Sequence, residues 1–165
     1  MAALDEIGLD RHLVPPQVWQ GQINTFGWAL RSRIPGKTLV LHVRGAENDK
    51  LDAEAHQATL AVMRSRCRDR DQRIHVHCFG GGPVQVADWL WEYPRTCFGF
   101  TLDILSGSPA QKQALRSLES TQYVLETDAP YFPPPGVRFS HPHYLGAVAT
   151  VVAEIRGVSP RGSSV

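Results

Sequence analysis

Short apolar runs recur along the chain and alternate with longer segments that fit helices. The runs cover residues 2–4, 38–43, 74–79, 97–102 and 123–125. They are four to seven residues long where clearest, and β-branched and aromatic residues, which favour strands, are enriched in them. Alternation of such runs with helical segments is typical of β/α units around a parallel sheet.

Three segments are predicted to form outer helices, because apolar side chains recur on one side of each. They are residues 54–66, 83–91 and 143–156. The length of 165 residues and the 42% hydrophobic content are ordinary for one globular domain. We therefore expect a single domain over residues 1–160, followed by a flexible tail at 161–165.

The composition says more about the cellular compartment of the protein than about its function. The chain has 17 Lys+Arg and 16 Asp+Glu, so its net charge does not favour strong nonspecific binding to polyanions. Any contact with nucleic acid must therefore be local. The three cysteines form no CxxC spacing, which argues against a disulfide framework and a thiolate zinc site. Neither a signal peptide nor an apolar membrane span is evident. We expect an intracellular protein of the cytoplasm or nucleus with no membrane partner.

Four polar residues stand at or just past the carboxyl ends of these runs: Glu6, His42, His77 and Asp128. In a β/α barrel those ends meet on one face, where active sites are built. Two imidazoles and two carboxylates suit a divalent ion such as Zn²⁺, Mn²⁺ or Mg²⁺. Such an ion polarises a phosphoryl oxygen and lowers the pKa of bound water from about 15.7 towards about 7.

Each of these residues also has a purely structural interpretation. A histidine that ends a strand is often a hydrogen-bonded structural residue, and Glu6 and Asp128 could be solvated loop acids or helix caps. Spacing alone leaves both interpretations open. His75, in the same run as His77, is left out of the set because we expect it to face the opposite side of its strand.

Local motifs add a second line of argument. In chain order they are Glu6-Ile-Gly-Leu-Asp10, His42-Val-Arg44, His77-Cys-Phe-Gly-Gly81, Gly99-Phe-Thr101, Glu126-Thr-Asp-Ala-Pro-Tyr131, then His141-Pro-His-Tyr-Leu and, after a helix, Gly157-Val-Ser-Pro. Glu-Thr-Asp-Ala-Pro-Tyr after an apolar strand is the most specific. Together they resemble the motif series of the TatD deoxyribonuclease family, over roughly residues 4–160.

The resemblance implies a metal-dependent hydrolase that cleaves DNA phosphodiester bonds, usually with Mg²⁺, although Mn²⁺ and Zn²⁺ also fit. It implies an α/β fold, here a partial TIM barrel with roughly strands four to eight. Glu6, His42, His77 and Asp128 fall on metal-ligand positions, with Glu6 and Asp128 as the catalytic carboxylates and Asp128 suited to orient or deprotonate the attacking water. Arg44 is a candidate for phosphate contact, since a guanidinium matches phosphate oxygens bidentately, or else it forms a salt bridge at the barrel rim.

The chain also departs from the family pattern. The family's first strand carries a His-x-His pair that helps to hold one of two metals, and no such pair precedes Glu6. Gly80 also stands where the family commonly has a small hydroxyl residue. A five-stranded parallel sheet leaves two edges unpaired, which predicts self-association. Three alternatives to an active nuclease therefore stay open: a catalytically impaired fragment or pseudoenzyme, an amide or ester hydrolase of the same fold, and, less favoured, a DNA-binding module without chemistry.

Overall fold

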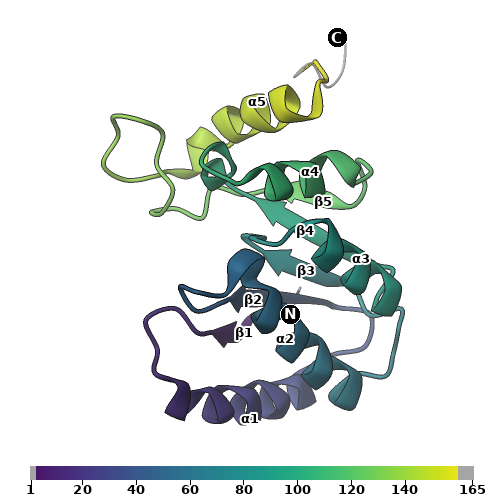
Figure 1. Cartoon of the computed structure of the whole chain (residues 1–165). Helices are drawn as coiled ribbons and strands as arrows, with labels where there is room; N and C mark the ends of the chain where they lie inside the picture. The colour runs from purple at the N-terminus through teal and green to yellow at the C-terminus, as the bar shows by residue number, and fades with distance from the viewer. Residues whose placement is uncertain (1–2, 160–165) are drawn as a thin grey trace.

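One parallel sheet organises the molecule. The computed structural model describes residues 3–159, and its strands are β1 (Ala3–Asp10), β2 (Thr38–Arg44), β3 (Ile74–His77), β4 (Thr96–Phe100) and β5 (Tyr123–Leu125). They pair in chain order, β1-β2-β3-β4-β5, and each pairing is parallel (Figure 1). The predicted α/β fold with a parallel sheet is confirmed.

Helices connect the strands and pack against one another beside the sheet (Figure 1). They are α1 (Trp19–Ala29), α2 (Ala53–Arg66), α3 (Pro83–Glu92), α4 (Pro109–Ser117) and α5 (Leu145–Arg156). Short 3-10 turns occupy Pro16–Val18, Leu30–Ser32, Lys50–Asp52, Leu102–Leu105 and Pro142–Tyr144. Helix α1 packs on β1 and α2, α3 packs on α4, and α4 packs on α5.

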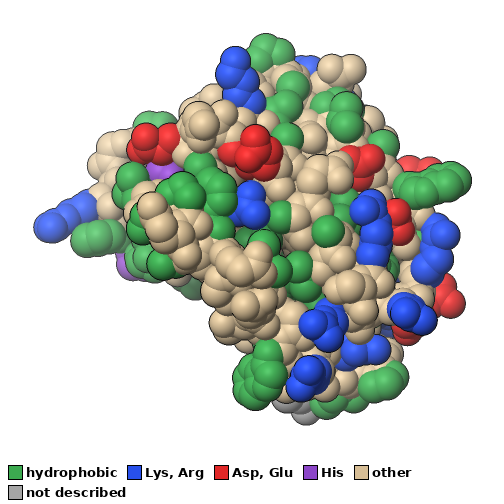
Figure 2. Space-filling view, turned by 60° about the horizontal axis from the view of Figure 1, so that its bottom comes forward, with side chains coloured by type: hydrophobic (Ala, Val, Ile, Leu, Met, Phe, Trp, Pro, Cys, Tyr) green, Lys and Arg blue, Asp and Glu red, His purple; other side chains and the backbone are tan. Residues whose placement is uncertain are grey.

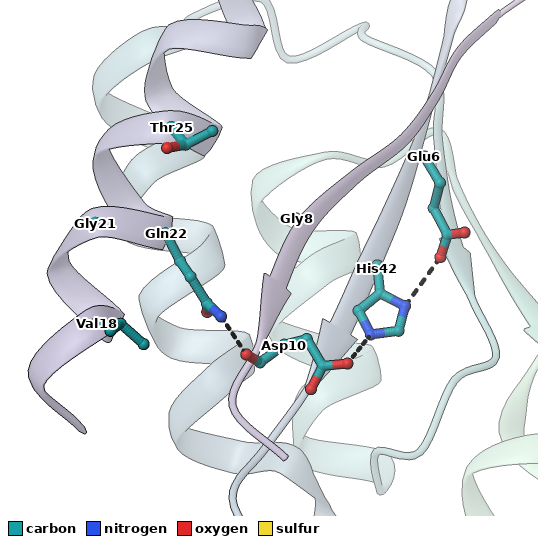
Figure 3. A pocket seen from close by; sticks show the side chains of 8 residues that line it. All are labelled: Glu6, Gly8, Asp10, Val18, Gly21, Gln22, Thr25 and His42. Atoms are coloured by element: carbon teal, nitrogen blue, oxygen red, sulfur yellow. Dashed lines mark hydrogen bonds and ion pairs between the residues drawn. The ribbon is translucent and has the colours of Figure 1, made fainter. Parts of the chain in front are cut away.

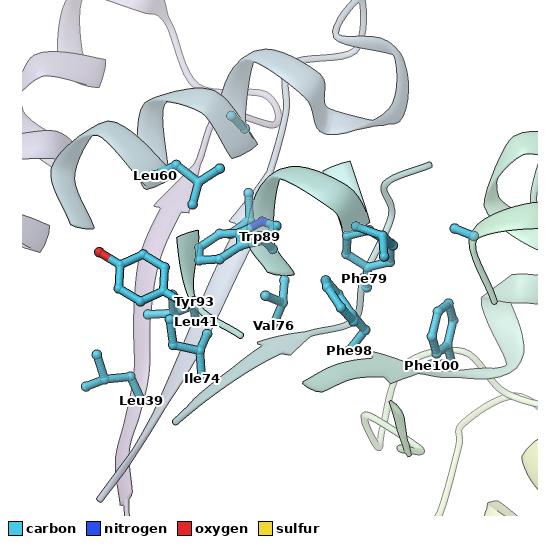
Figure 4. Close-up of a cluster of buried hydrophobic side chains, with 14 of the residues drawn as sticks. Leu39, Leu41, Leu60, Ile74, Val76, Phe79, Trp89, Tyr93, Phe98 and Phe100 are labelled. Atoms are coloured by element: carbon cyan, nitrogen blue, oxygen red, sulfur yellow. The ribbon is translucent and has the colours of Figure 1, made fainter. Parts of the chain in front are cut away.

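The two faces of the sheet differ in chemistry because side chains alternate along each strand. In β2 and β3 the buried positions are Leu39, Leu41, Val43, Ile74 and Val76. They pack with Trp89 of α3 and with Phe79, Phe98 and Phe100 in the core that Figure 4 shows. The other face of the same strands carries the partly exposed His42, His75 and His77. One face of the sheet therefore packs in the hydrophobic core, and the other face carries polar side chains.

The predicted elements overlap the observed ones within a few residues at most ends, and three differences are larger. The first strand runs on to Asp10, well past the predicted run at 2–4. The predicted helix at 143–156 starts at Leu145, because Pro142–Tyr144 forms a 3-10 turn. Helices α1 and α4 were not predicted individually. The predicted tail, residues 161–165, lies outside the described residues, and the domain bounds stay a prediction.

Both edges of the sheet are open within residues 3–159. Strand β1 pairs only with β2, and β5 pairs only with β4. Unpaired edges offer backbone groups to another strand, so self-association stays a prediction that this topology motivates. Across the same residues, no helix combines the length and the apolar character that a membrane crossing needs.

A buried histidine makes the stability of the core depend on pH. His56 is 1% exposed, accepts a hydrogen bond from Trp89 Nε1 at 3.0 Å, and packs beside Phe79. Burial lowers the pKa of His56 to about 3. Below about pH 6.5 the unfolded chain takes up a proton at this ring that the folded chain excludes. The stability that His56 contributes is thus complete above pH 6.5 and is lost as the pH falls towards 3.

We expect a His56→Gln variant, whose amide oxygen can still accept from Trp89, to lose less stability on acidification than the wild type. Between pH 6.5 and pH 5 the difference between the two losses should be about 1–2 kcal/mol, since one pH unit corresponds to about 1.4 kcal/mol per proton. Urea unfolding at both pH values measures it. Equal losses in the two proteins would mean that His56 is protonated in the folded state.

Candidate active-site cleft and metal ligands

The predicted site residues line one cleft of about 740 Å³ at the carboxyl ends of the strands. His77 is the last residue of β3, His42 lies two residues before the end of β2, and Asp128 follows β5. Glu6 is also at the cleft, but its predicted position at a strand end is wrong. It lies inside β1, where the register with β2 shifts between Leu4 and Ile7. The Glu6 carboxylate nevertheless contacts histidines of β2 and β3.

The four predicted ligands form a continuous series of contacts. His42 Nδ1 lies 2.9 Å from Glu6 Oε1, and His77 Nε2 lies 3.8 Å from the same oxygen. His77 Nε2 is also 3.3 Å from Asp128 Oδ1. The structure therefore brings together side chains that are up to 122 positions apart in the sequence, 128 against 6.

Asp10 is a cleft residue that sequence reasoning did not select. It ends β1, and its Oδ2 atom lies 3.2 Å from His42 Nε2, so His42 is held between two carboxylates (Figure 3). Gln22 of α1 donates a hydrogen bond to the Asp10 backbone oxygen. Glu6, Asp10 and His42 also line an adjoining groove of about 670 Å³ between β1 and α1. Asp10 could have been found from its place in the quoted Glu-Ile-Gly-Leu-Asp motif at a strand end.

A second cluster, which we call the inner triad, consists of His75, His77 and Glu126. His77 Nδ1 lies 3.2 Å from Glu126 Oε1, and His75 Nε2 contacts the same oxygen. The expectation that His75 faces away from His77 is wrong. Residues two apart in a strand share a face, so both rings point to the polar side of β3.

The cluster determines the charge states at the cleft floor. The hydrogen bond to Glu126 raises the pKa of His77 to about 9, against the effect of burial. Burial by itself would raise the pKa of Glu126, but His75, His77 and the Cys78 backbone N–H outweigh it and hold that pKa at about 2. Glu126 is thus an anion throughout the neutral range.

Cys78 lies at the cleft without the properties of a nucleophile. Its Sγ atom is 3.3 Å from His77 Nε2. Burial, followed by the charges of Glu126 and Asp128, raises the pKa of the Cys78 thiol well above its usual range. Because the thiolate is the nucleophilic form, a protonated thiol argues against covalent cysteine catalysis.

Gly80 is required by close packing against Asp52. A Cβ atom on Gly80 would lie 2.2 Å from Asp52 Oδ2. Asp52 is fixed there because its Oδ1 accepts a hydrogen bond from the Gly45 N–H at 2.7 Å. Burial also raises the pKa of the Asp52 carboxyl. A residue with a side chain at position 80 would displace this carboxyl, which explains the glycine at this motif position.

Comparison with known protein families identifies the family to which the chain belongs. The sequence profile described as TatD related DNase matches residues 1–163. The chain belongs to this family.

A curated relative and a solved structure agree with that assignment. The human protein named 3'-5' RNA nuclease TATDN2 is 32% identical over 128 residues, which are 74% of this chain and 15% of that protein. The crystal structure of an uncharacterized amidohydrolase from Saccharomyces cerevisiae superposes with a TM-score of 0.72 at 17% identity, covering 97% of this chain and 61% of that one. The chain thus spans only part of both proteins, and the second likeness supports the partial-barrel fold.

Arg44 of this TatD-family chain stands at the rim of the cleft. It is the exposed last residue of β2 and lines the same cavity as the four predicted ligands. Among residues 3–159 it forms no ion pair within 4.0 Å, so the rim salt bridge considered from the sequence is not observed there.

The donor set of the cleft fits a divalent cation. Glu6, His42, His77 and Asp128 supply carboxylate oxygens and imidazole nitrogens, the mixed ligands that such ions accept. Around His77, the donor atoms of Cys78 and Asp128 lie within 4.8 Å of one another and of the ring. The cleft of this TatD-family chain therefore carries the ligand types that a divalent metal accepts.

Proposed function

We propose that this chain provides the catalytic cleft of a metal-dependent nuclease that hydrolyses phosphodiester bonds in DNA. The observation that carries the proposal is the meeting of Glu6, His42, His77 and Asp128 in one cleft of a chain from the TatD-related DNase family. These four residues hold the divalent cation, for which Mg²⁺ is the first candidate and Mn²⁺ or Zn²⁺ are alternatives. The bound ion supplies a Lewis acid for the phosphoryl oxygen.

The protein groups take distinct roles in the proposed reaction. Asp128, next to His77, orients the attacking water and accepts its proton. Glu6 fixes the two histidines, since one of its oxygens contacts both rings. Arg44 at the rim binds a phosphate of the substrate through its guanidinium.

Aromatic side chains at the cleft support a nucleic-acid substrate. Tyr131 and Phe132 line the cavity, and Tyr131 is 65% exposed. An exposed ring beside a hydrolytic centre can stack on a base, which contributes about 1–3 kcal/mol in single-strand binding. On the face seen in Figure 2, Lys and Arg side chains gather to one side with Asp and Glu beside them. This mixture fits recognition through the cleft better than a broad basic surface.

Hydrolysis of end-labelled single-stranded DNA and RNA of matched sequence, with Mg²⁺ and with chelator, tests the proposal. We expect Mg²⁺-dependent cleavage of DNA that falls by about 10²–10³-fold in Asp128→Asn, because a preorganised charged group is removed from the reacting centre. Asp88→Asn is the matched control, since Asp88 lies on α3 and contacts Gln57 outside the cleft.

Cleavage that persists in chelator, or that is equal in the two variants, would overturn the assignment of the cleft. Asp128-dependent cleavage of RNA alone would keep the cleft and replace DNA as the substrate.

A further inference from the structure

The inner triad holds three potential metal ligands in one place. The nitrogens of His75 and His77 and an oxygen of Glu126 all lie within 4.8 Å of one another. The Nε2 atom of His75 is buried and pairs directly with Glu126 Oε1. The three donor atoms therefore already face one another.

The neighbouring backbone is shaped around the Glu126 carboxylate. A Cβ atom on Gly99 of β4 would lie 2.2 Å from Glu126 Oε2, so only glycine leaves room for the carboxylate to reach across β4 to β3. The Cys78 N–H donates to Glu126 Oε2 at 3.0 Å and fixes that oxygen. The other oxygen, Oε1, is therefore directed at the two imidazoles.

One ligand distance suits a metal ion, and two cavities border the triad. In a tetrahedral site with metal–ligand bonds of about 2.0–2.1 Å, neighbouring ligand atoms are about 3.3 Å apart. His77 Nδ1 and Glu126 Oε1 are 3.2 Å apart already. His75 borders a cavity of about 530 Å³ at the amino ends of the strands, while His77 borders the cleft at their carboxyl ends. The triad thus lies between the cleft and a second cavity at the opposite ends of the strands.

We propose that His75, His77 and Glu126 form a binding site for a first-row transition metal, best represented by Zn²⁺. Two imidazoles and one carboxylate are a ligand set that zinc accepts, with a water completing the tetrahedron. Mg²⁺ prefers oxygen ligands and keeps its waters, so the inner triad should discriminate strongly against it. The proposal does not require the cleft to be a nuclease, although the site shares His77 with the cleft.

Sharing of His77 links the two sites. Its Nδ1 faces the inner triad, and its Nε2 faces Glu6 and Asp128. A neutral imidazole has one acceptor nitrogen, so the ring serves one metal at a time. Zinc in the inner triad would withdraw His77 from the cleft.

Calorimetric titration of the whole chain with Zn²⁺ tests this inference. We expect the tightest binding event to weaken at least tenfold in His75→Val, because loss of even an outer partner of a metal ligand typically costs about 10–100-fold. His42→Ala, which removes a cleft ligand and spares the triad, should change this event by less than about twofold. Glu126→Gln is a second variant that keeps the side-chain volume, and circular dichroism shows whether each variant is folded.

Titration with Co²⁺ provides a readout that does not depend on heat. A tetrahedral ligand field gives intense visible absorption, which should appear in the wild type and in His42→Ala and be absent in His75→Val. The inference is overturned if the wild type binds no Zn²⁺, if His75→Val binds as tightly as the wild type, or if His42→Ala weakens the event as much as His75→Val does. The last result would assign the zinc to the cleft.

Discussion

Adding three β/α units in front of β1, the first with a His-x-His strand, is expected to raise DNA hydrolysis by at least about 10²–10³-fold. The TatD-type pattern has such a pair, and none precedes Glu6 in this sequence. Two more imidazoles would join Glu6 and Asp128 as preorganised partners of the charge that develops during hydrolysis. Removing one such partner from an active site typically lowers the rate by about that factor.

The added strands would also close the open side of the cleft. Strand β1 has one paired edge within residues 3–159, and the Glu6 and Asp10 side chains on it are 39% and 42% exposed. Strand β1 has only one neighbour to fix it, so added pairing on its open edge should hold these carboxylates more firmly. Because a misplacement of about 1 Å can cost on the order of 10²-fold in rate, pairing of β1 should add to the gain.

The experiment compares the present chain, the extended chain and an extended chain with Ala-x-Ala in place of His-x-His, each with and without Asp128→Asn. The Ala-x-Ala version separates closure of the sheet from the added ligands. Equal and Asp128-dependent rates for the present and extended chains would show that the half-barrel suffices. The impaired-fragment alternative would then be wrong.

The sequence predicted those features that depend on local pattern. Runs such as 38–43 and 74–79 are apolar enough to identify strands. The rule that parallel strands end on one face then placed His42, His77 and Asp128 at one cleft. The sequence showed that Gly80 departs from the family pattern. The reason for this glycine is the contact with Asp52, which is 28 positions away and is seen only in the structure.

Some features of the site were missed because the strand was read wrongly, and others because they depend on contacts between distant residues. Glu6 was misplaced because an irregularity inside β1 cannot be seen in a short apolar run. His75 was excluded by a wrong assignment of faces, although a period of two residues places it beside His77. Glu126 and Asp10 both belong to the sequence motifs. Glu126 contacts His77, which is 49 residues away in the sequence, and Asp10 contacts His42, which is 32 residues away, so neither role could be predicted locally.

Replacing Trp89 with alanine is expected to destabilise the fold by about 3–5 kcal/mol, the usual cost of removing a large buried aromatic side chain. Trp89 is 0% exposed and lies between the sheet and α2, where Figure 4 shows it beside Tyr93 and Leu60. Its ring also donates to His56 Nδ1, so the substitution leaves that buried nitrogen without its partner. For a domain whose total stability is about 5–15 kcal/mol, the loss is a large fraction.

Trp91, two residues along the same helix, is the matched control. It is 75% exposed, so Trp91→Ala removes the same side chain from the same helix and should change the free energy of unfolding by no more than about 0.5 kcal/mol. Urea unfolding followed by circular dichroism compares the two variants with the wild type. Since α3 carries no cleft residue, Trp91→Ala should also retain hydrolysis. Equal destabilisation by the two substitutions would mean that α3 does not pack on the sheet through its Trp89 face, and the core described above would have to be rebuilt.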